Sequence, residues 1–232
     1  MSIHAIIPAA GQGRRFGGAK QFQILAGKPL LLYSLEAFES CSLIQTVCLV
    51  VPEGDLDRAR DLVRKNKLKK ISLILPGGSE RQESVRIGFK ALPPSDFIVV
   101  HDAARPFVTP DLLLKLIEGA KEFGGCLAGT PARDTIKRVD PEGMVRETVD
   151  RSALWNIQTP QVFRYDLLKK AFEKAVQDHF VGTDEAMLVE RLGVKIKVID
   201  GGIGNMKITT PEDLKIAEGL MARQAHHAEG IL

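Results

Sequence analysis

The chain is 232 residues long, and its 32 Lys and Arg residues nearly balance 29 Asp and Glu residues, leaving a formal net charge of +3. With 44% hydrophobic and 26% charged residues, the composition is that of a globular protein and excludes a disordered or collagen-like chain. The sequence lacks the roughly 18 consecutive apolar residues of a membrane span, and its three scattered cysteines favour a reducing, cytoplasmic environment over a disulfide framework.

Predicted strands and helices alternate along the chain. Strands are expected at Ile3–Ile7, Thr46–Val51, Ile71–Leu75, Phe97–Val100, Cys126–Thr130 and Lys195–Ile199. Helices are expected at Leu30–Glu39, Leu56–Lys65, Glu80–Ala91, Asp111–Phe123, Asp166–Gln177, Thr183–Leu192 and from Pro211 to about Ala222, with a frayed tail beyond Gln224. The alternation predicts an α/β fold: a single Rossmann-like domain over residues 1–232, with a mainly parallel twisted sheet flanked by helices.

A glycine-rich loop follows the first predicted strand, with the sequence PAAGQGRRFGGAKQ from Pro8 to Gln21. It fails the dinucleotide fingerprint, because Phe16 occupies the third glycine position, and it fails the Walker pattern, because Ala19 follows Gly18. Small residues expose backbone N–H groups, and Arg and Lys follow at once. The loop therefore predicts a nucleoside triphosphate held at its phosphates, with a purely structural turn as the alternative.

The segment GGSERQES follows the third predicted strand and opens a helix. Its N–H groups and polar side chains suit recognition of a base edge, and Ser84 lies one turn into the helix. A capping box between Ser79 and Gln82 explains part of the pattern equally well. The basic cluster at residues 65–70, before this strand, has no interleaved aromatic residues and ends a predicted helix, so no nucleic-acid partner is expected.

The segment HDAARP follows the fourth predicted strand, so it should lie at the same sheet edge as the glycine loop. Asp102 could hold Mg²⁺ against a phosphate, and Arg105 could bind a second phosphoryl group in a bidentate manner. The alternative is an Asp102–Arg105 ion pair that only structures the turn. His101, beside an apolar strand, is expected to be a structural hydrogen-bonding residue.

Residues 135–149 break the alternation. Two β-like runs flank Asp140-Pro141-Glu142-Gly143, which predicts a hairpin. Because an isolated hairpin is marginal in water, we expect a protruding arm, residues 135–151, that packs on a second subunit of a homodimer. The alternative is a hairpin folded back on its own domain.

Together these segments resemble the nucleotidyltransferase family, and within it the 2-C-methyl-D-erythritol 4-phosphate cytidylyltransferases of the non-mevalonate isoprenoid pathway. The resemblance covers nearly the whole chain. It rests on PAAGQGRRFGG with KQ, GGSERQES, HDAARP, ARDTIK, VDR, TPQVF, the TDEA run that begins at Thr183, NMKIT and PEDL. The chain departs from the family at Ala19, often a proline there, and at Ser79, commonly an aspartate.

The resemblance implies roles for particular residues. Arg15 and Lys20 would contact the triphosphate and stabilise the pentacoordinate phosphorus, and Lys207 would act with them on the nucleophile. Nucleotide-binding residues would be Ala10, Gly11 and Gly13 at the phosphates, Gly78, Ser84 and Ala103 at the cytosine and ribose, and Asp102 on the metal side. The second substrate would contact Arg105, Thr183 and Lys207, with Thr135 and Arg151 coming from the partner subunit's arm.

The implied reaction is attack of a phosphate monoester on the α-phosphorus of CTP, with Mg²⁺ as cofactor and pyrophosphate as leaving group. A phosphate monoester with a second pKa of about 6 is already anionic at neutral pH, so no general base is needed. Three alternatives remain: a cytidylyltransferase for a polyol phosphate such as ribitol 5-phosphate, a non-catalytic nucleotide sensor, and a nicotinamide-dependent oxidoreductase, which Phe16 disfavours.

Overall fold

The computed structural model describes residues 1–11, 16, 18 and 20–229, with side chains of the last helix as far as residue 222. In this described part, seven strands form one sheet in the order β11-β7-β10-β6-β1-β4-β5. The strands are β1 (Ile3–Pro8), β4 (Thr46–Val51), β5 (Ile71–Pro76), β6 (Phe97–Val100), β7 (Gly125–Pro131), β10 (Trp155–Arg164) and β11 (Lys197–Asp200).

The pairing confirms a mainly parallel sheet. β1 pairs in parallel with β4 and β6, β4 with β5, and β7 with β11. β10 runs antiparallel to both of its neighbours, β6 and β7. This strand was missed by the sequence analysis, which predicted no element between the arm and Asp166. Its polar residues Gln158, Thr159 and Gln161 are buried, so it lacks the apolar pattern of the other strands.

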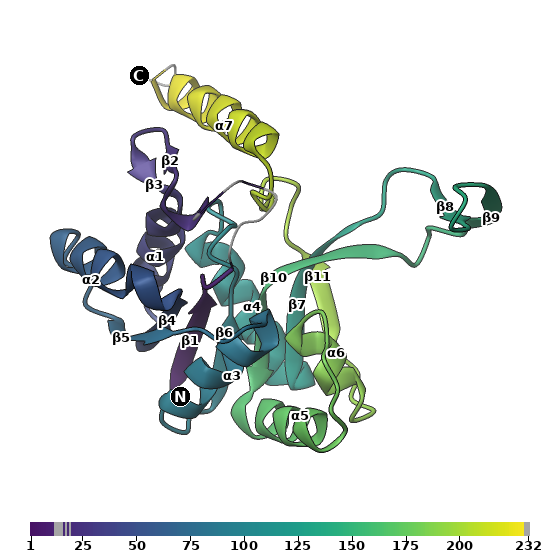
Figure 1. Ribbon diagram of the computed structural model, residues 1–232, viewed down its shortest axis with the longest axis horizontal. Helices are drawn as coiled ribbons and strands as arrows, with labels where there is room; N and C mark the ends of the chain where they lie inside the picture. The colour runs from purple at the N-terminus through teal and green to yellow at the C-terminus, as the bar shows by residue number, and fades with distance from the viewer. Residues whose placement is uncertain (12–15, 17, 19, 230–232) are drawn as a thin grey trace.

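Helices cover both faces of the sheet (Figure 1). They are α1 (Leu30–Ser40), α2 (Leu56–Lys65), α3 (Arg81–Ala91), α4 (Pro110–Phe123), α5 (Tyr165–Gln177), α6 (Glu185–Glu190) and α7 (Pro211–Glu229), with short 3₁₀ turns at Lys20–Phe22 and Glu53–Asp55. At the start of α4 the Thr109 hydroxyl accepts a hydrogen bond from the Leu112 N–H at 3.2 Å, and Pro110 follows as the first helical residue. None of the described helices is long and apolar enough to cross a membrane.

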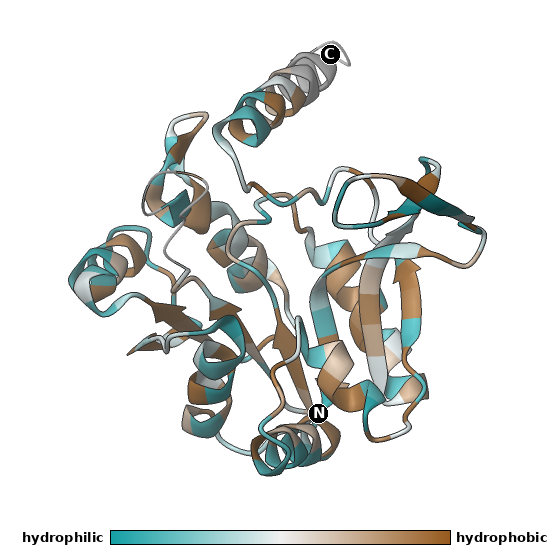
Figure 2. Ribbon diagram, turned by 45° about the vertical axis from the view of Figure 1, so that its right-hand side comes forward, coloured by the Kyte–Doolittle hydropathy of each residue, from teal (hydrophilic) through white to brown (hydrophobic). Residues whose placement is uncertain are grey.

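Side chains of the central strands alternate between two hydrophobic clusters. Ile7 and Val99 join the cluster under α1, α2 and α4, whereas Ile6 and Val100 join the one under α3, α5 and α6. Figure 2 shows these strands in the hydrophobic colour between helices with hydrophilic outer faces. This period of two lets consecutive residues of one buried strand stabilise both layers. All three cysteines are buried free thiols.

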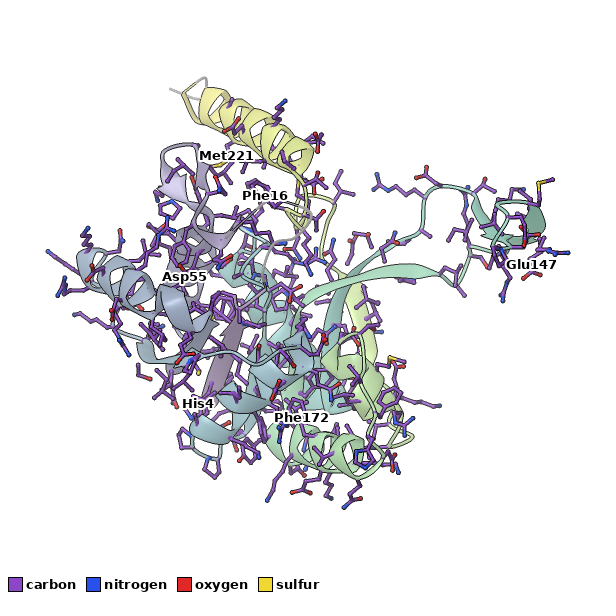
Figure 3. The ribbon with its side chains drawn as sticks, in the orientation of Figure 1. His4, Phe16, Asp55, Glu147, Phe172 and Met221 are labelled. Atoms are coloured by element: carbon purple, nitrogen blue, oxygen red, sulfur yellow. The ribbon has the colours of Figure 1, made fainter. Side chains whose placement is uncertain are left out.

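A third, smaller cluster fixes the C-terminal helix. Leu25, Leu30, Ile208 and Ala217 are buried together beneath α7, where the short strands β2 (Ile24–Leu25) and β3 (Lys28–Pro29) also lie. Phe16 and Met221 pack against it, as Figure 3 shows. The helix continues to Glu229, beyond the end at about Ala222 that the sequence predicted.

The predicted arm is present. β8 (Ile136–Val139) and β9 (Val145–Val149) form an antiparallel hairpin carried away from the sheet (Figure 1), and Glu147 lies at its far end in Figure 3. The side chains of Val139, Met144 and Val145 are exposed there. Within the single chain the hairpin projects from the domain rather than lying on it (Figure 1).

Candidate active site

One cleft lies where the carboxyl ends of β1, β5 and β6 meet the loop that precedes α7. Its lining comes from the first loop (Pro8, Ala9, Ala10, Gly11, Lys20, Gln21), the loop after β5 (Gly78, Ser79, Glu80, Arg81, Ser84), the loop after β6 (Asp102, Ala103, Ala104) and Lys207. The strand order places these loops side by side, which is where ligands bind in open parallel sheets.

The first loop and the loop after β5 touch each other. A Cβ atom on Gly77 would overlap the side chain of Ala10 and would lie 2.9 Å from Ser84 Oγ. Ala9 N–H donates to Val50 O at 2.6 Å, and Gly77 N–H donates to Val51 O at 2.8 Å. Glycine at residue 77 therefore allows the two loops to close against each other and form one wall of the cleft.

Side-chain hydrogen bonds hold the loop after β5 open toward the cleft. Ser84 Oγ accepts from Gly78 N–H at 3.1 Å and donates to Glu80 O at 3.1 Å. Ser79 N–H and Oγ both donate to Glu83 Oε2, at 2.9 and 3.0 Å. The predicted capping box between Ser79 and Gln82 is therefore wrong.

The Gln82 side chain forms its hydrogen bonds with a different segment, the one before α6. Its amide donates to Phe180 O at 3.1 Å and accepts from Gly182 N–H at 2.7 Å. These bonds attach the first turn of α3 to the segment that precedes α6, so the amide is held by residues about 100 positions away and is not free to cap its own helix.

Asp102 is the charged centre of the cleft floor. Its carboxylate accepts from Arg81 Nε at 2.9 Å and from Lys207 Nζ at 2.6 Å. Burial by itself would raise the pKa of Asp102, but Arg81 and Lys207 outweigh it and hold that pKa well below its usual range. The carboxylate is therefore ionised at neutral pH. The alternative of an Asp102–Arg105 ion pair is not found, because Asp102 pairs with Arg81 and Lys207 instead.

Arg81 joins Asp102 to a second carboxylate. Its two Nη atoms donate to Glu185 Oε1 and Oε2 at 2.9 and 3.0 Å, and the Glu185 side chain is 1% exposed. Burial opposes the charged guanidinium, yet Glu185 and Asp102 raise the pKa of Arg81 above its usual value. Burial raises the pKa of Glu185, and Arg81 works against that rise.

His101 supports the backbone of Asp102. Thr159 Oγ1 accepts from Asp102 N–H at 2.9 Å and lies 3.2 Å from His101 Nδ1, while His101 Nε2 lies 3.1 Å from Arg105 O. Burial lowers the pKa of His101 to about 4, so the ring is neutral at pH 7. A neutral ring that accepts at Nδ1 and donates at Nε2 satisfies both contacts. The structural role predicted for His101 agrees with this geometry.

Two lysines from distant parts of the chain meet at the cleft. Lys20 Nζ donates to Ile208 O at 3.0 Å, so it lies beside the residue that follows Lys207. The loop carrying Lys207 is secured by the start of α7, where Asp213 Oδ2 accepts from the Thr209 and Thr210 N–H groups at 2.7 and 2.9 Å. Cations from two distant parts of the chain thus line one cleft, where they favour an anionic ligand.

Eight of the predicted site residues come together in this cleft. They are Ala10, Gly11, Lys20, Gly78, Ser84, Asp102, Ala103 and Lys207. Gly13 and Arg15 lie outside the described residues. Arg105 is buried next to the cleft, where Nη1 donates to Asn205 O at 2.7 Å and Nε has no hydrogen-bond partner within the described structure.

The remaining predicted residues lie on other elements. Thr183 is exposed just before α6, with its hydroxyl 3.8 Å from Met187 Sδ. Thr135 and Arg151 are exposed at the two ends of the arm hairpin, and Arg151 donates to Arg133 O. Within one chain the structure does not bring Thr135 and Arg151 into the cleft lining.

Sequence reasoning missed Arg81 and Glu185. Arg81 stands inside the GGSERQES segment and is the first residue of α3, so its position was visible although its partners were not. Glu185 lies 104 residues away on α6. The local sequence offered one indication of Glu185, a glutamate directly after the N-cap Asp184. In the structure this glutamate is buried among the apolar residues of α6.

The side chains near the cleft that could act as metal ligands indicate how a divalent cation would be bound there. Among the described residues, no group of three or more His, Cys, Asp or Glu side chains could hold a metal. Asp102 supplies one carboxylate at the cleft. Mg²⁺ is commonly bound through one or two carboxylates plus substrate phosphates, so the residues fit a cation carried on a polyphosphate rather than an all-protein site.

Comparison with known proteins shows close relatives over nearly the full length. The family model IspD, described as 2-C-methyl-D-erythritol 4-phosphate cytidylyltransferase, matches residues 3–223. A protein of that name from Symbiobacterium thermophilum is 45% identical, with 97% of this chain and 99% of that protein covered. Another, from Syntrophus aciditrophicus, is 43% identical, with 96% and 97% covered.

Solved structures agree with the sequence comparison. The crystal structure of 4-diphosphocytidyl-2C-methyl-D-erythritol synthase from Anaerococcus prevotii superposes with a TM-score of 0.84 at 32% identity, and the match covers 95% of this chain and 96% of that one. The 2-C-methyl-D-erythritol 4-phosphate cytidylyltransferase from Thermus thermophilus gives a TM-score of 0.78 at 32% identity, with 95% and 98% covered.

Proposed function

Because the chain belongs to the 2-C-methyl-D-erythritol 4-phosphate cytidylyltransferase family, we propose that the cleft containing Lys20, Asp102 and Lys207 is where it carries out the family's reaction. The enzyme is a nucleotidyltransferase that uses CTP and 2-C-methyl-D-erythritol 4-phosphate. The product is the CDP-methylerythritol, and pyrophosphate is released. The observation that carries the assignment is the convergence of two lysines and the described ends of the glycine-rich loop at one sheet edge.

The chemistry proposed for the cleft is direct displacement. A nonbridging oxygen of the acceptor phosphate attacks the α-phosphorus of CTP, the bond from that phosphorus to the β-phosphate bridging oxygen breaks, and pyrophosphate leaves. The acceptor is an anion at neutral pH, so the cleft needs no base. Its residues act by positioning and by neutralising charge, which are the principal means of catalysing phosphoryl transfer.

We assign the two lysines to opposite sides of the reacting phosphorus. Lys20, with Arg15, faces the triphosphate and stabilises charge on the pentacoordinate phosphorus. Lys207, with Arg105 and Thr183, holds the acceptor phosphate. Ala10, Gly11 and Gly13 offer backbone donors to the phosphates, and Gly78, Ser84 and Ala103 contact the cytosine and ribose. The lining of the cleft supports this for the described members of the set other than Arg105 and Thr183.

Mg²⁺ is the proposed cofactor. Asp102 is the residue that would hold it, together with phosphate oxygens of the nucleotide. When bound, the cation supplies neutralisation of the triphosphate charge. Arg81 and Lys207, at 2.9 and 2.6 Å from Asp102, keep that carboxylate ionised and therefore able to act as a ligand.

We further propose a homodimer in which each arm reaches the other subunit. The exposed side chains of Val139, Met144 and Val145 on a projecting hairpin support this, because apolar groups gathered on an arm suit burial against a partner. Thr135 and Arg151 would then complete the partner's acceptor site. The three buried free thiols support a reducing, cytoplasmic location.

The test of the function is pyrophosphate release with each nucleoside triphosphate against a panel of acceptors. CTP with 2-C-methyl-D-erythritol 4-phosphate should give the fastest turnover. Turnover of CTP with ribitol 5-phosphate but not with the methylerythritol phosphate would reverse the order of the acceptors. Binding of CTP without pyrophosphate release from any acceptor would instead indicate a nucleotide sensor.

A further inference from the structure

Four charged residues from four separate segments form a continuous network beside the cleft. Glu185 on α6 binds Arg81 at the start of α3, Arg81 binds Asp102 after β6, and Asp102 binds Lys207 before α7. Three of the four, Arg81, Asp102 and Lys207, line the cleft, whereas Glu185 does not. Glu185 can therefore affect a ligand in the cleft only indirectly, through its ion pair with Arg81.

Stability alone is a poor explanation for Glu185. The side chain is 1% exposed, and removing a carboxylate from water costs several kcal/mol that a buried ion pair often does no more than offset. Replacing a whole buried ion pair by apolar residues of similar volume is often neutral or stabilising. A charge retained there fits a role in placing another group.

The geometry shows which group is placed. A guanidinium presents five N–H donors in a rigid fork, and both Nη atoms of Arg81 are used on Glu185 at 2.9 and 3.0 Å. Only Nε is then directed at Asp102, where it binds Oδ1 at 2.9 Å. Asp102 Oδ2 is left for Lys207 at 2.6 Å.

Without Glu185 the Arg81 guanidinium could turn and donate hydrogen bonds to both oxygens of Asp102. A bidentate Arg–carboxylate pair is favourable, and it would displace Lys207 from Oδ2. Alternatively, the freed Nη donors could turn into the cleft, where the phosphates bind. Either movement would misplace a cation relative to the reacting phosphorus.

We propose that Glu185 is a positioning residue for the transfer: by binding both Nη atoms of Arg81 it fixes the orientation of the guanidinium, so that Nε binds one oxygen of Asp102 and the other oxygen is left to Lys207. The inference rests on the proposed function, whose acceptor side includes Lys207. The same pair ties the nucleotide side, through Arg81 after β5, to the segment that carries Thr183 on the acceptor side.

The test compares Glu185→Gln with the wild type and with Asp166→Asn, a control that removes a carboxylate from the exposed Arg164–Asp166 pair. Glutamine keeps the shape of the side chain and one acceptor oxygen, but it replaces the second oxygen with an NH2 donor that cannot accept from Arg81, so only one Nη atom is held. We expect kcat for pyrophosphate release to fall roughly 10- to 100-fold, while the Kd for CTP measured by calorimetry changes less than about threefold. Asp166→Asn should match the wild type.

A second variant distinguishes positioning from a general loss of structure. In the double variant Arg81→Gln/Glu185→Gln the fork that Glu185 restrains is gone, so the two losses in kcat should not add. If Glu185→Gln does not fold, Glu185→Asp carries the same comparison, because its shorter side chain cannot reach both Nη atoms. Thermal melting of each variant establishes that the measured enzyme is folded.

The outcomes separate the two claims. An active wild type with an equally active Glu185→Gln variant overturns the positioning role alone. So does a loss of kcat matched by an equal loss of CTP affinity, because a collapsed cleft would produce both. A wild type that releases no pyrophosphate from CTP and 2-C-methyl-D-erythritol 4-phosphate contradicts the proposed function itself.

Discussion

Lys20 and Lys207 illustrate how single residues form the site. They are 187 positions apart in the sequence, yet Lys20 Nζ binds the carbonyl of Ile208, the residue after Lys207. Lys207 in turn binds Asp102. Each ammonium group is held by a specific partner before substrate arrives, so little reorganisation is needed when the phosphates bind.

Replacing Lys20 should therefore affect the chemical step strongly. For Lys20→Ala we expect kcat to fall roughly 100- to 1,000-fold, the usual effect of removing one group that stabilises transition-state charge. The matched control is Lys28→Ala, whose ammonium pairs with Glu36 on the exposed surface. Pyrophosphate release measures both variants, and near-normal turnover of Lys20→Ala would contradict the role assigned to it.

His101 predicts a pH dependence of stability. Burial lowers its pKa from 6.5 to about 4, so between these values the unfolded chain binds more protons than the folded one. The stabilisation linked to the neutral His101 ring should be fully present above pH 6.5. The free energy of unfolding should then fall by about 3 kcal/mol as the pH drops to about 4. His4, whose pKa burial also lowers, acts in the same direction.

Urea denaturation across this pH range measures the effect, and His101→Gln should flatten most of it. A free energy of unfolding that stays constant between pH 6.5 and 4.5 would show that the ring is not held neutral. Asp102 does not change the free energy of unfolding within this pH range. Its pKa is depressed, so the stabilisation from its charge is lost only as the pH falls below the usual range of a carboxyl.

At the scale of elements, the contact between two loops shapes the wall of the cleft that we propose binds the nucleotide. The loop after β1 and the loop after β5 meet at Ala10 and Gly77, with Ser84 of α3 behind them. The carboxyl ends of β1 and β5 are separated in the sheet by β4 alone. The spacing between strands thus sets how close the loops come, and residue 77 must lack a side chain.

Gly77→Ala should disturb this contact. The added methyl group would overlap Ala10, so we expect a loss of about 1 to 3 kcal/mol in the free energy of unfolding and weaker binding of CTP. The control is Gly54→Ala, where an added Cβ meets nothing within 4 Å. Urea denaturation and calorimetry with CTP measure the two variants. Equal stability of Gly77→Ala and Gly54→Ala would show that the loops tolerate the methyl group.

The local elements were largely predictable from sequence because they follow local rules. Apolar runs such as Phe97–Val100 identify buried strands, and a hydroxyl before a proline, as at Thr109-Pro110, suits the start of a helix. β10 escaped prediction because several of its buried side chains are polar and form hydrogen bonds, such as Gln161 Nε2 to Asp184 Oδ2 at 2.7 Å. The Arg81–Glu185 pair escaped because it joins residues 104 positions apart, and no periodic pattern encodes such a contact.

The whole molecule consists of a body, which carries the cleft, and an arm that extends away from it (Figure 1). Thr135 and Arg151, expected at the acceptor, lie on the arm rather than in the cleft. The proposed dimer resolves this separation, since each arm would bring them to the other subunit's cleft. An interface of this kind contributes residues to catalysis as well as area to association.

Mixed dimers test that arrangement. Lys20→Ala and Arg151→Ala subunits should each be nearly inactive alone. After denaturation and refolding together, half of the dimers should be mixed, and one cleft in each mixed dimer should have both residues intact, which restores about a quarter of wild-type turnover. Activity no greater than the sum of the two parents would show that Arg151 acts within its own chain.

The central claim is that one cleft brings CTP and the acceptor phosphate together for direct displacement without a covalent intermediate. The most direct measurement is exchange of labelled pyrophosphate into CTP, with and without 2-C-methyl-D-erythritol 4-phosphate, or with its CDP product. We predict no exchange with CTP and pyrophosphate alone, and exchange once the acceptor or the product is present. Rapid exchange in the absence of both would reveal a CMP–enzyme intermediate and would contradict direct attack.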